Sequence, residues 1–303
     1  MILITLIIAT LLFPQGYGYI SPKMNETAVK ENEKLLRNCD RQLEELRNCK
    51  IEPHFDVISD GRPLDSYLCS FEGTGNATIL LAGNSFVMRQ YESIIKVSKH
   101  KFKKLYLATQ SMCTIFTRQN EAIWKCNYVS NRLKEFMTVL KPDLMIVTQR
   151  LSVGNLFNTP LNTFKDAKND SITTIMKEYW KEYSELTKNI IIIEPHPTMY
   201  DSPKENLAKL LSLNASLDNY YISQKDYNAE VNPGWWRTLA SIENCPKCST
   251  ISIRQHFCHN STKECDIYDH QKFLTYYCDP GHFTTIGVEK FIRDLAAAIN
   301  KVI

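Results

Sequence analysis

The sequence predicts an α/β protein, in which a central parallel sheet lies between two layers of helices in a flavodoxin-like, three-layer sandwich. Two observations lead to this fold class. From residue 78 onward, short apolar runs alternate with longer segments that carry the apolar repeat of an amphipathic helix. Polar or turn-forming residues such as Gly83 follow the ends of these runs. A chain of 303 residues can bury the core of one domain of roughly 230 residues and still carry an extension.

Short apolar runs favour buried strands, and longer periodic segments favour helices. We expect strands at residues 78–82, 105–108, 143–148 and 190–194, with helices between them at 86–99, 121–140 and 172–187 and a last helix at 288–299. Residues 220–277 have neither pattern, and we expect short strands or irregular structure there. Because helices separate the strands, the connections are crossovers and the sheet is predicted to be parallel.

The N-terminus is predicted to be a signal peptide over residues 1–18. Residues 1–13 are apolar apart from threonines, and Pro14 and the small-residue pattern at Gly16 and Gly18 follow. The apolar run is too short to span a bilayer comfortably, although the absence of Lys and Arg before it keeps an uncleaved anchor as an alternative. No later segment has an apolar stretch of membrane length. We therefore expect a secreted protein or one of the secretory-pathway lumen.

Residues 19–68 are predicted to form a helical extension ahead of a domain at residues 69–303. Within the extension, residues 25–47 are charged and have a narrow leucine stripe, and Cys39 and Cys49 would tie the helix locally or to the main body.

Ten cysteines, an even number, predict disulfides in an oxidising compartment. Cys113 with Cys126, and Cys258 with Cys265, are the local bridges that we expect. The alternative is a zinc cluster or a redox pair, because Cys245 and Cys248 are spaced as C-x-x-C and two histidines follow. Five N-glycosylation sequons agree with passage through the secretory pathway. They are Asn25, Asn76, Asn169, Asn214 and Asn260.

The net charge of +3 is not that of a nucleic-acid-binding protein. The densest basic run, residues 96–104, is explained by a solvated helix end, with an anionic surface or acidic glycan as the alternative.

Three residues predict acyl-transfer chemistry. Ser85 follows a strand and a glycine turn at the start of a helix, where backbone amides are unpaired and can hold an oxyanion. Asp279 and His282 lie three apart on a turn near the C-terminus, so the carboxylate can orient the imidazole that takes the serine proton. Taken singly, Ser85 reads as a helix N-cap, His282 as a surface histidine and Asp279 as a turn residue.

These motifs resemble a known family. Gly83-Asn84-Ser85 is similar to the Gly-Asp-Ser block of the GDSL/SGNH hydrolases, and Asp279-x-x-His282 to their last block. The runs at residues 69–76 and 277–287 resemble the extracytoplasmic SGNH domain fused to membrane O-acyltransferases. The resemblance implies the SGNH hydrolase fold over residues 69 to the C-terminus, with Ser85, Asp279 and His282 as the catalytic residues. The sequence departs from the pattern at Asn84, and of the Gly-x-Asn-Asp block only a fragment ending at Asn155 remains.

Other residues are expected at the same edge of the sheet, where the strands end. Arg150 follows the third predicted strand, and an Arg is common there in the acyltransferase-linked domains. Arg150 and Asn155 are therefore candidates for oxyanion or substrate contact, and a surface ion pair is the alternative for Arg150. His196, bracketed by prolines, either touches substrate or belongs to a rigid loop. Trp235 and Trp236 are either a sugar platform or buried.

The sequence thus predicts a secreted serine esterase or O-acyltransferase that handles O-acyl, for example acetyl, groups on a carbohydrate or other hydroxyl acceptor. No metal or organic cofactor is implied, no nucleic-acid partner is expected, and a membrane acyltransferase is a possible partner. The alternative is a secreted glycoprotein that keeps the fold and binds a glycan or protein without turnover. Asn84 and the degraded oxyanion block favour that alternative.

Overall fold

The computed structural model describes residues 22–49, 66–116, 126, 129–152, 157 and 159–303. The predicted signal peptide and Asn155 lie outside these residues. No helix in the described ranges combines the length and the apolar character needed to cross a membrane.

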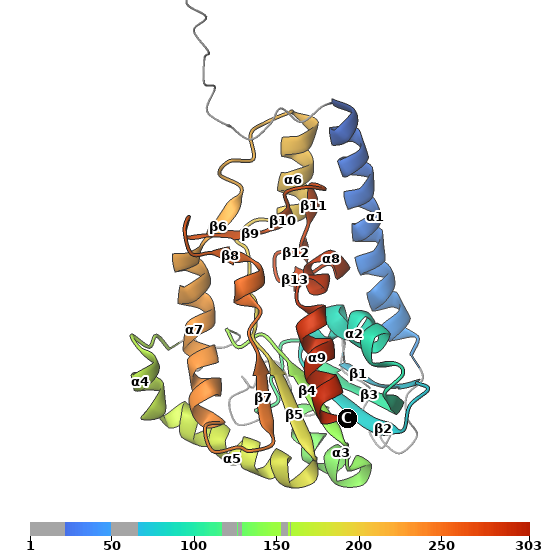
Figure 1. Ribbon diagram of the computed structural model, residues 1–303, viewed down its shortest axis with the longest axis vertical. Helices are drawn as coiled ribbons and strands as arrows, with labels where there is room; N and C mark the ends of the chain where they lie inside the picture. The colour runs from blue at the N-terminus through green and yellow to red at the C-terminus, as the bar shows by residue number, and fades with distance from the viewer. Residues whose placement is uncertain (1–21, 50–65, 117–125, 127–128, 153–156, 158) are drawn as a thin grey trace, which may run out of the picture.

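A six-stranded sheet forms the centre of the molecule (Figure 1). Its strands, in spatial order, are β1 (Ser66–Glu72), β3 (Phe102–Gln110), β2 (Ala77–Gly83), β4 (Leu144–Thr148), β5 (Asn189–Ile193) and β7 (Cys248–Ile251). All neighbours are parallel except β1, which pairs with β3 in the antiparallel direction. The prediction of a parallel sheet is therefore correct for five strands and wrong for the edge strand, which no helix separates from β2.

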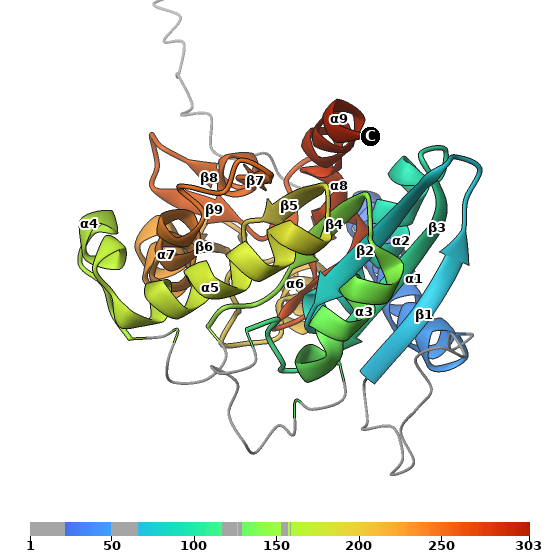
Figure 2. The ribbon, with the colours of Figure 1, turned by 90° about the horizontal axis from the view of Figure 1, so that it is seen from below.

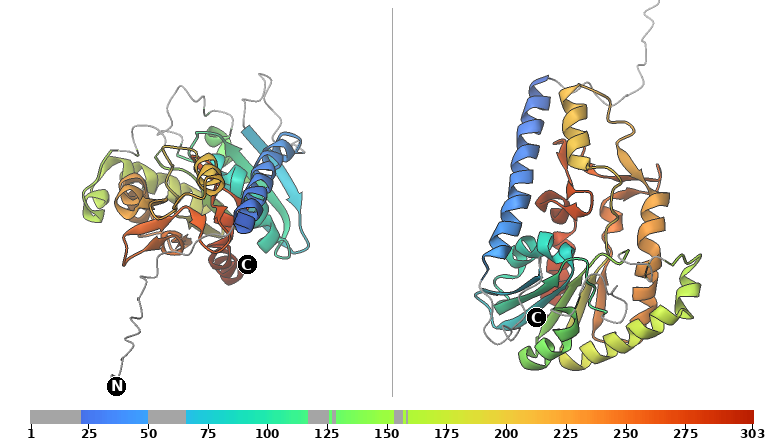
Figure 3. Two further views of the ribbon diagram at one scale, coloured as in Figure 1. Left: turned by 90° about the horizontal axis from the view of Figure 1, so that it is seen from above. Right: turned by 180° about the vertical axis from the view of Figure 1, so that it is seen from behind.

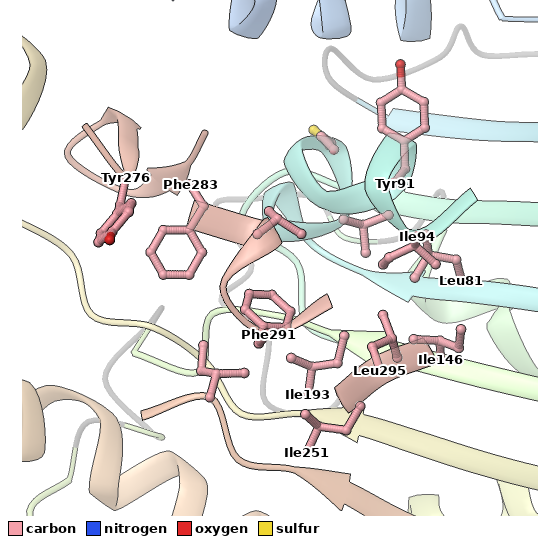
Figure 4. Close-up of a cluster of buried hydrophobic side chains, with 14 of the residues drawn as sticks. Leu81, Tyr91, Ile94, Ile146, Ile193, Ile251, Tyr276, Phe283, Phe291 and Leu295 are labelled. Atoms are coloured by element: carbon pink, nitrogen blue, oxygen red, sulfur yellow. The ribbon is translucent and has the colours of Figure 1, made fainter. Parts of the chain in front are cut away.

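Alternate residues of the central strands belong to two separate cores, one on each face of the sheet. Leu81, Ile146 and Ile193 point to the face covered by α2 (Ser85–Ser98) and α9 (Ile292–Val302) (Figure 4). Their neighbours Ala82 and Val147 belong to the other core, which is covered by α3 (Leu133–Leu140), α5 (Ser171–Leu186) and α7 (Gln224–Ser241) (Figure 2). Both faces are apolar because helices cover both, as the continuous apolar runs of a buried parallel sheet require.

The N-terminal helix α1 (Pro22–Arg47) packs along α2 and α6 (Pro203–Ser212), at one side of the molecule (Figures 1 and 3). Short strands from two segments, one directly before α7 and one after β7, lie above the carboxyl end of the sheet (Figure 1). They are β6 (Tyr221–Ser223), β8 (Cys258–His259), β9 (Glu264–Asp266), β10 (Tyr268–Asp269), β11 (Leu274–Thr275), β12 (Tyr277–Asp279) and β13 (His282–Phe283).

Helix α7 corrects the prediction for residues 220–277, which were expected to be strands or irregular. Its interior contains Pro233 and Gly234, two residue types that disfavour the interior of a helix. Gly234 has a packing reason, because a Cβ there would lie 2.5 Å from the Cβ of Leu151. Trp235 is buried in the core of this face, as its non-sugar interpretation predicts, and Trp236 is half-buried.

The predicted helix at residues 121–140 begins too early. Cys126 and Val129 lie in turns, a 3-10 turn covers Ser130–Arg132, and α3 follows, while most of residues 117–128 lie outside the described chain. The last helix is divided into α8 (Thr285–Glu289) and α9. The basic run at residues 96–104 spans the end of α2 and the start of β3, at the opposite end of the sheet from Ser85.

All ten cysteines are paired. The predicted bridges Cys113–Cys126 and Cys258–Cys265 are confirmed, and the others are Cys39–Cys278, Cys49–Cys69 and Cys245–Cys248. The zinc alternative is wrong, because the sulfurs that it needs are bonded to one another. Nor does the described part of the chain contain a cluster of three metal-ligating side chains.

Candidate active site

Ser85 lies where the sheet topology reverses. β2 has β3 on one side and β4 on the other, so the chain leaves β2 at the switch point where open α/β sheets bind ligands. Gly83 makes the turn there with φ of +149°, and a Cβ at this position would lie 1.9 Å from the carbonyl oxygen of Thr148. A side chain is therefore excluded at position 83, the last residue of the strand.

Asn84 clamps this turn to the loop that follows β4. Its side chain is buried, its Nδ2 donates to the carbonyl oxygen of Arg150 at 2.9 Å, and its Oδ1 accepts from the Arg150 amide at 3.0 Å. The same Oδ1 accepts from the Phe86 amide at 3.3 Å and caps α2. A carboxylate can accept these bonds but cannot donate to the Arg150 carbonyl. The replacement of Asp by Asn thus has a structural use.

Ser85, His282 and Asp279 form one hydrogen-bonded chain. The His282 Nε2 lies 2.8 Å from the Ser85 Oγ, and the His282 Nδ1 lies 2.7 Å from the Asp279 Oδ1. With a proton on Nδ1 donated to the carboxylate, Nε2 can accept the serine proton. The structure thus brings Ser85 together with His282, which is 197 positions away in the sequence, and with the Asp279 that precedes His282 by three residues.

The environment of Asp279 keeps it ionised. Burial raises the pKa of this carboxyl, but the hydrogen bond and charge of His282, the Gly281 amide and the charge of Arg89 outweigh burial and hold the pKa below its usual value. The Gly281 amide donates to Oδ1 at 2.8 Å, and the Arg89 Nη2 lies 3.6 Å from Oδ2. An ionised carboxylate is the form that can orient an imidazole.

His196 contacts the loop at residues 279–282, which carries Asp279 and His282. Its ring is stacked between Phe86 and Phe283, with centroids 3.9 and 3.7 Å away, and its Nε2 lies 3.2 Å from the Gly281 carbonyl oxygen. Burial, together with the neighbouring His282, holds the pKa of His196 well below its usual value, so the ring is neutral. Its burial favours the rigid-loop interpretation over substrate contact.

Arg150 is part of a polar network with α7. Its Nε donates to Ser152 Oγ at 2.7 Å, its Nη2 to Thr198 Oγ1 at 3.2 Å, and Nη2 lies 3.6 Å from the Glu230 Oε1. Glu230 also accepts from the Ser152 hydroxyl and from both the amide and the hydroxyl of Thr198, at 2.9 Å each. The ion pair expected as the alternative for Arg150 is therefore present.

A cavity of about 690 Å³ opens beside this network. Arg150, Thr198 and Glu230 line it together with the exposed Tyr200. The lining does not include Ser85, but the Thr198 methyl lies 3.7 Å from the position that a Gly281 Cβ would take. The cavity and the triad are thus neighbours across the loop at residues 279–282.

Sequence reasoning missed Arg89 and Glu230. Arg89 had one local signal, because it follows Ser85 by four residues and so lies one helical turn further along α2. Glu230 had none, since its helix was not predicted.

The five sequons differ in exposure. Asn76, Asn169, Asn214 and Asn260 are exposed, whereas the Asn25 side chain is buried and its Nδ2 donates to the Leu211 carbonyl oxygen at 3.0 Å. Asn25 and Asn214 also line a second cavity, of about 600 Å³, away from the triad.

Fold and site define an α/β protein with a serine, histidine and aspartate at the switch point of its sheet. The chain belongs to the SGNH family, because the family described as "SGNH domain (fused to AT3 domains)" matches residues 48–297. No curated protein matches the chain significantly.

Several solved structures are similar to the chain at low sequence identity, and the first of those named here shares its fold. The periplasmic domain of a lipopolysaccharide acetyltransferase from Salmonella ser. Paratyphi A is 18% identical, with a TM-score of 0.50 over 75% of this chain and 84% of that one. The catalytic domain of a peptidoglycan O-acetyltransferase from Streptococcus pneumoniae is 13% identical, with a TM-score of 0.37 over 76% and 96% of the two chains. A catalytic mutant of an acetylxylan esterase from Geobacillus stearothermophilus is 12% identical, with a TM-score of 0.40 over 76% and 96%.

Proposed function

We propose that this protein is a serine esterase or O-acyltransferase that acts on O-acyl groups, with acetyl as the group of first choice, on a carbohydrate or another hydroxyl compound. The observation that carries the proposal is the chain from Asp279 through His282 to the Ser85 Oγ, with both links shorter than 3 Å. Membership of a family related to acetyltransferase and acetylesterase domains supports it.

In the proposed reaction, His282 takes the proton of Ser85 as the Oγ attacks the ester carbonyl. Asp279 stabilises the imidazolium that forms. The imidazolium then gives its proton to the leaving alcohol, the C–O bond of the ester breaks, and the acyl group remains on Ser85. Water or an acceptor hydroxyl, deprotonated by the same imidazole, then attacks the acyl carbonyl. The bond from the acyl carbon to the Ser85 Oγ breaks, and the imidazolium returns the proton to Oγ.

The oxyanion needs donors, and of the family's Gly-x-Asn-Asp block the sequence keeps only a fragment ending at Asn155, which lies outside the described residues. The Ser85 amide stands at the first position of α2, where the helix itself offers it no acceptor. We assign the second contact to Arg150, whose contacts with Ser152, Thr198 and Glu230 engage Nε and Nη2 and fix the plane of the guanidinium.

The proposed location is the secretory-pathway lumen or the outside of the cell. Five disulfides and the four exposed sequons support it. A membrane acyltransferase is the proposed source of the acyl group, since the family's SGNH domains occur fused to AT3 domains.

Fluorophosphonate labelling tests the nucleophile. The parent chain should label at Ser85 and hydrolyse a short-chain aryl acetate, while Ser85→Ala and His282→Ala should each lose roughly a thousandfold or more in kcat. The double variant should be no worse than either single one, because the two groups act as a unit. Ser212→Ala, on the exposed face of α6, is the matched control.

If the fluorophosphonate does not label the parent protein, the proposed enzyme activity is refuted, and the alternative is a glycoprotein that binds a glycan or protein without turnover. Equal hydrolysis by Ser85→Ala and the parent would refute the assignment of the nucleophile. Hydrolysis and transfer are separated by adding an acceptor saccharide and measuring whether the acetyl group appears on it or as free acetate.

A further inference from the structure

A buried arginine and a disulfide connect the N-terminal helix to Asp279, the carboxylate predicted to orient the catalytic histidine. We propose that Arg89, anchored by α1, is a positioning residue that fixes the Asp279 carboxylate for its contact with His282. The inference rests on the proposed function and extends the site to a helix that the sequence presents as an appendage.

The contacts join Arg89, α1 and the strand before Asp279 into one closed ring of bonded residues. Arg89 is 7% exposed, its Nη1 donates to the carbonyl oxygen of Cys39 in α1, and its Nη2 lies 3.6 Å from the Asp279 Oδ2. Cys39 is bonded through its sulfur to Cys278, the residue directly before Asp279. The same residue of α1 therefore holds the guanidinium through its backbone and the catalytic strand through its side chain.

The two oxygens of Asp279 have different partners. Oδ1 receives both the Gly281 amide and the His282 Nδ1, whereas Oδ2 faces Arg89. A carboxylate can rotate about its Cβ–Cγ bond, and an ion pair to one oxygen opposes this rotation because it would separate the charges. Arg89 thus holds the plane of the carboxylate in the orientation in which one oxygen meets the imidazole.

Helix α1 is held firmly enough to serve as the anchor. The buried Asn32 donates from Nδ2 to the Phe273 carbonyl oxygen at 2.7 Å and accepts from the Thr275 amide at 2.8 Å, so it joins α1 to β11. On the other side, the Tyr91 hydroxyl of α2 donates to the Gln42 carbonyl oxygen at 3.3 Å.

The charged and titratable groups around Asp279 come from four elements. His282 follows on β13, Arg89 approaches from α2, and the neutral His196 belongs to the loop after β5. Burial lowers the pKa of Arg89 from its usual value, while the charges of Asp279 and of Asp40 in α1 oppose this shift. Arg89 is still a cation at neutral pH. Without it, the Asp279–His282 pair takes up a proton more readily.

Kinetics over a pH series test the proposal in Arg89→Met and Arg89→Lys. Arg41→Met is the matched control, because Arg41 contacts Glu92 between α1 and α2 on the exposed side. For Arg89→Met, kcat on an aryl acetate should fall about tenfold to a hundredfold with KM changed less than about twofold. The acidic limb of the pH–activity profile should move up by about one pH unit. Arg89→Lys should keep the parent's limb and lose part of kcat.

A kcat and an acidic limb equal to those of Arg41→Met would overturn the proposal, even with a lowered melting temperature. Should Arg89→Met not fold, a parent-like kcat in Arg89→Lys has the same meaning. Hydrogen exchange at the Gly281 amide gives a reading that does not depend on activity. Faster exchange in an Arg89 variant, but not in Arg41→Met, supports the proposal that Arg89 fixes the Asp279 carboxylate. This reading holds even if the parent protein does not react with the fluorophosphonate. Unchanged exchange overturns the proposal.

Discussion

At the scale of single residues, the turn from β2 into α2 shows why each side chain is the one present. Gly83 is required by a positive φ and by the Thr148 carbonyl that a Cβ would strike. Asn84 both donates to and accepts from the backbone of Arg150, which an Asp cannot do. The departure from the family's Gly-Asp-Ser pattern therefore ties the nucleophile turn to the loop that carries Arg150.

Arg150→Leu tests the proposed oxyanion contact at this scale. Because one donor of the developing charge is removed, kcat should fall on the order of a hundredfold while the melting temperature stays nearly unchanged. Arg150→Lys should restore the rate only in part, since an ammonium lacks the planar fork. Steady-state kinetics with thermal unfolding decide it. Normal turnover in the Leu variant would make Arg150 only an ion-pair partner of Glu230.

At the scale of elements, α7 connects the fold to the site. Glu230 of α7 extends toward Arg150, and about two turns further along the helix Arg237 is fully buried. Arg237 donates from Nε and Nη2 to the two oxygens of Asp170 at 2.9 and 3.1 Å, and from Nη1 to two carbonyl oxygens at 3.0 Å. Asp170 is also the N-cap of α5, so one carboxylate joins two helices.

Asp170→Asn should lower the free energy of unfolding at pH 7 by about 3 kcal/mol, because it leaves the buried guanidinium of Arg237 without its counter-charge. Burial raises the pKa of Asp170, but the bonds from Arg237 and Thr173 outweigh it and hold the pKa below its usual value. Because the pKa of Asp170 is lower in the folded protein than in the unfolded chain, the ionised carboxylate stabilises the fold at any pH above its unfolded-state pKa. This stabilisation is lost as the pH falls through the folded-state pKa.

The difference between parent and Asp170→Asn should therefore shrink on acidification below the ordinary carboxyl range, about pH 4. Urea unfolding from pH 7 to pH 3 measures it, with the exposed Asp218→Asn as control. A difference that is constant over this range would show that the carboxylate charge contributes nothing.

At the scale of the whole molecule, the chain is closed by bonds between distant segments. Cys39–Cys278 joins residues 239 positions apart, whereas Cys245–Cys248 joins residues three apart. α1 packs on α2 and α6 and is bonded to β12, so what the sequence presents as an extension is packed against the main body (Figure 3).

The number of residues between the two cysteines of a bridge predicts how much stability is lost when that bridge is removed. In the chain-entropy view, Cys39→Ala/Cys278→Ala should lower the free energy of unfolding by about 5–6 kcal/mol, against about 2 kcal/mol for Cys245→Ala/Cys248→Ala. Denaturant unfolding of the oxidised proteins provides the comparison. Equal losses in the two double variants would mean that restriction of the unfolded chain is not what the long bridge contributes.

The sequence by itself determined what is local or periodic. The alternation of apolar runs predicted four of the strands and the helices α2 and α5 within a few residues, and close spacing predicted Cys113–Cys126 and Cys258–Cys265. It also named Ser85, Asp279 and His282, since each stands in a short motif.

Only the tertiary structure decided the direction of β1, the helix α7, and the pairing of Cys39 with Cys278. It also decided that Arg89 faces Asp279. The physical reason is the same in each case. Strand pairing, the tolerance of a Pro-Gly pair inside a helix, disulfide choice and ion pairing depend on which distant backbone segments approach one another. That approach is set by burial on the two faces of the sheet rather than by neighbours in the sequence.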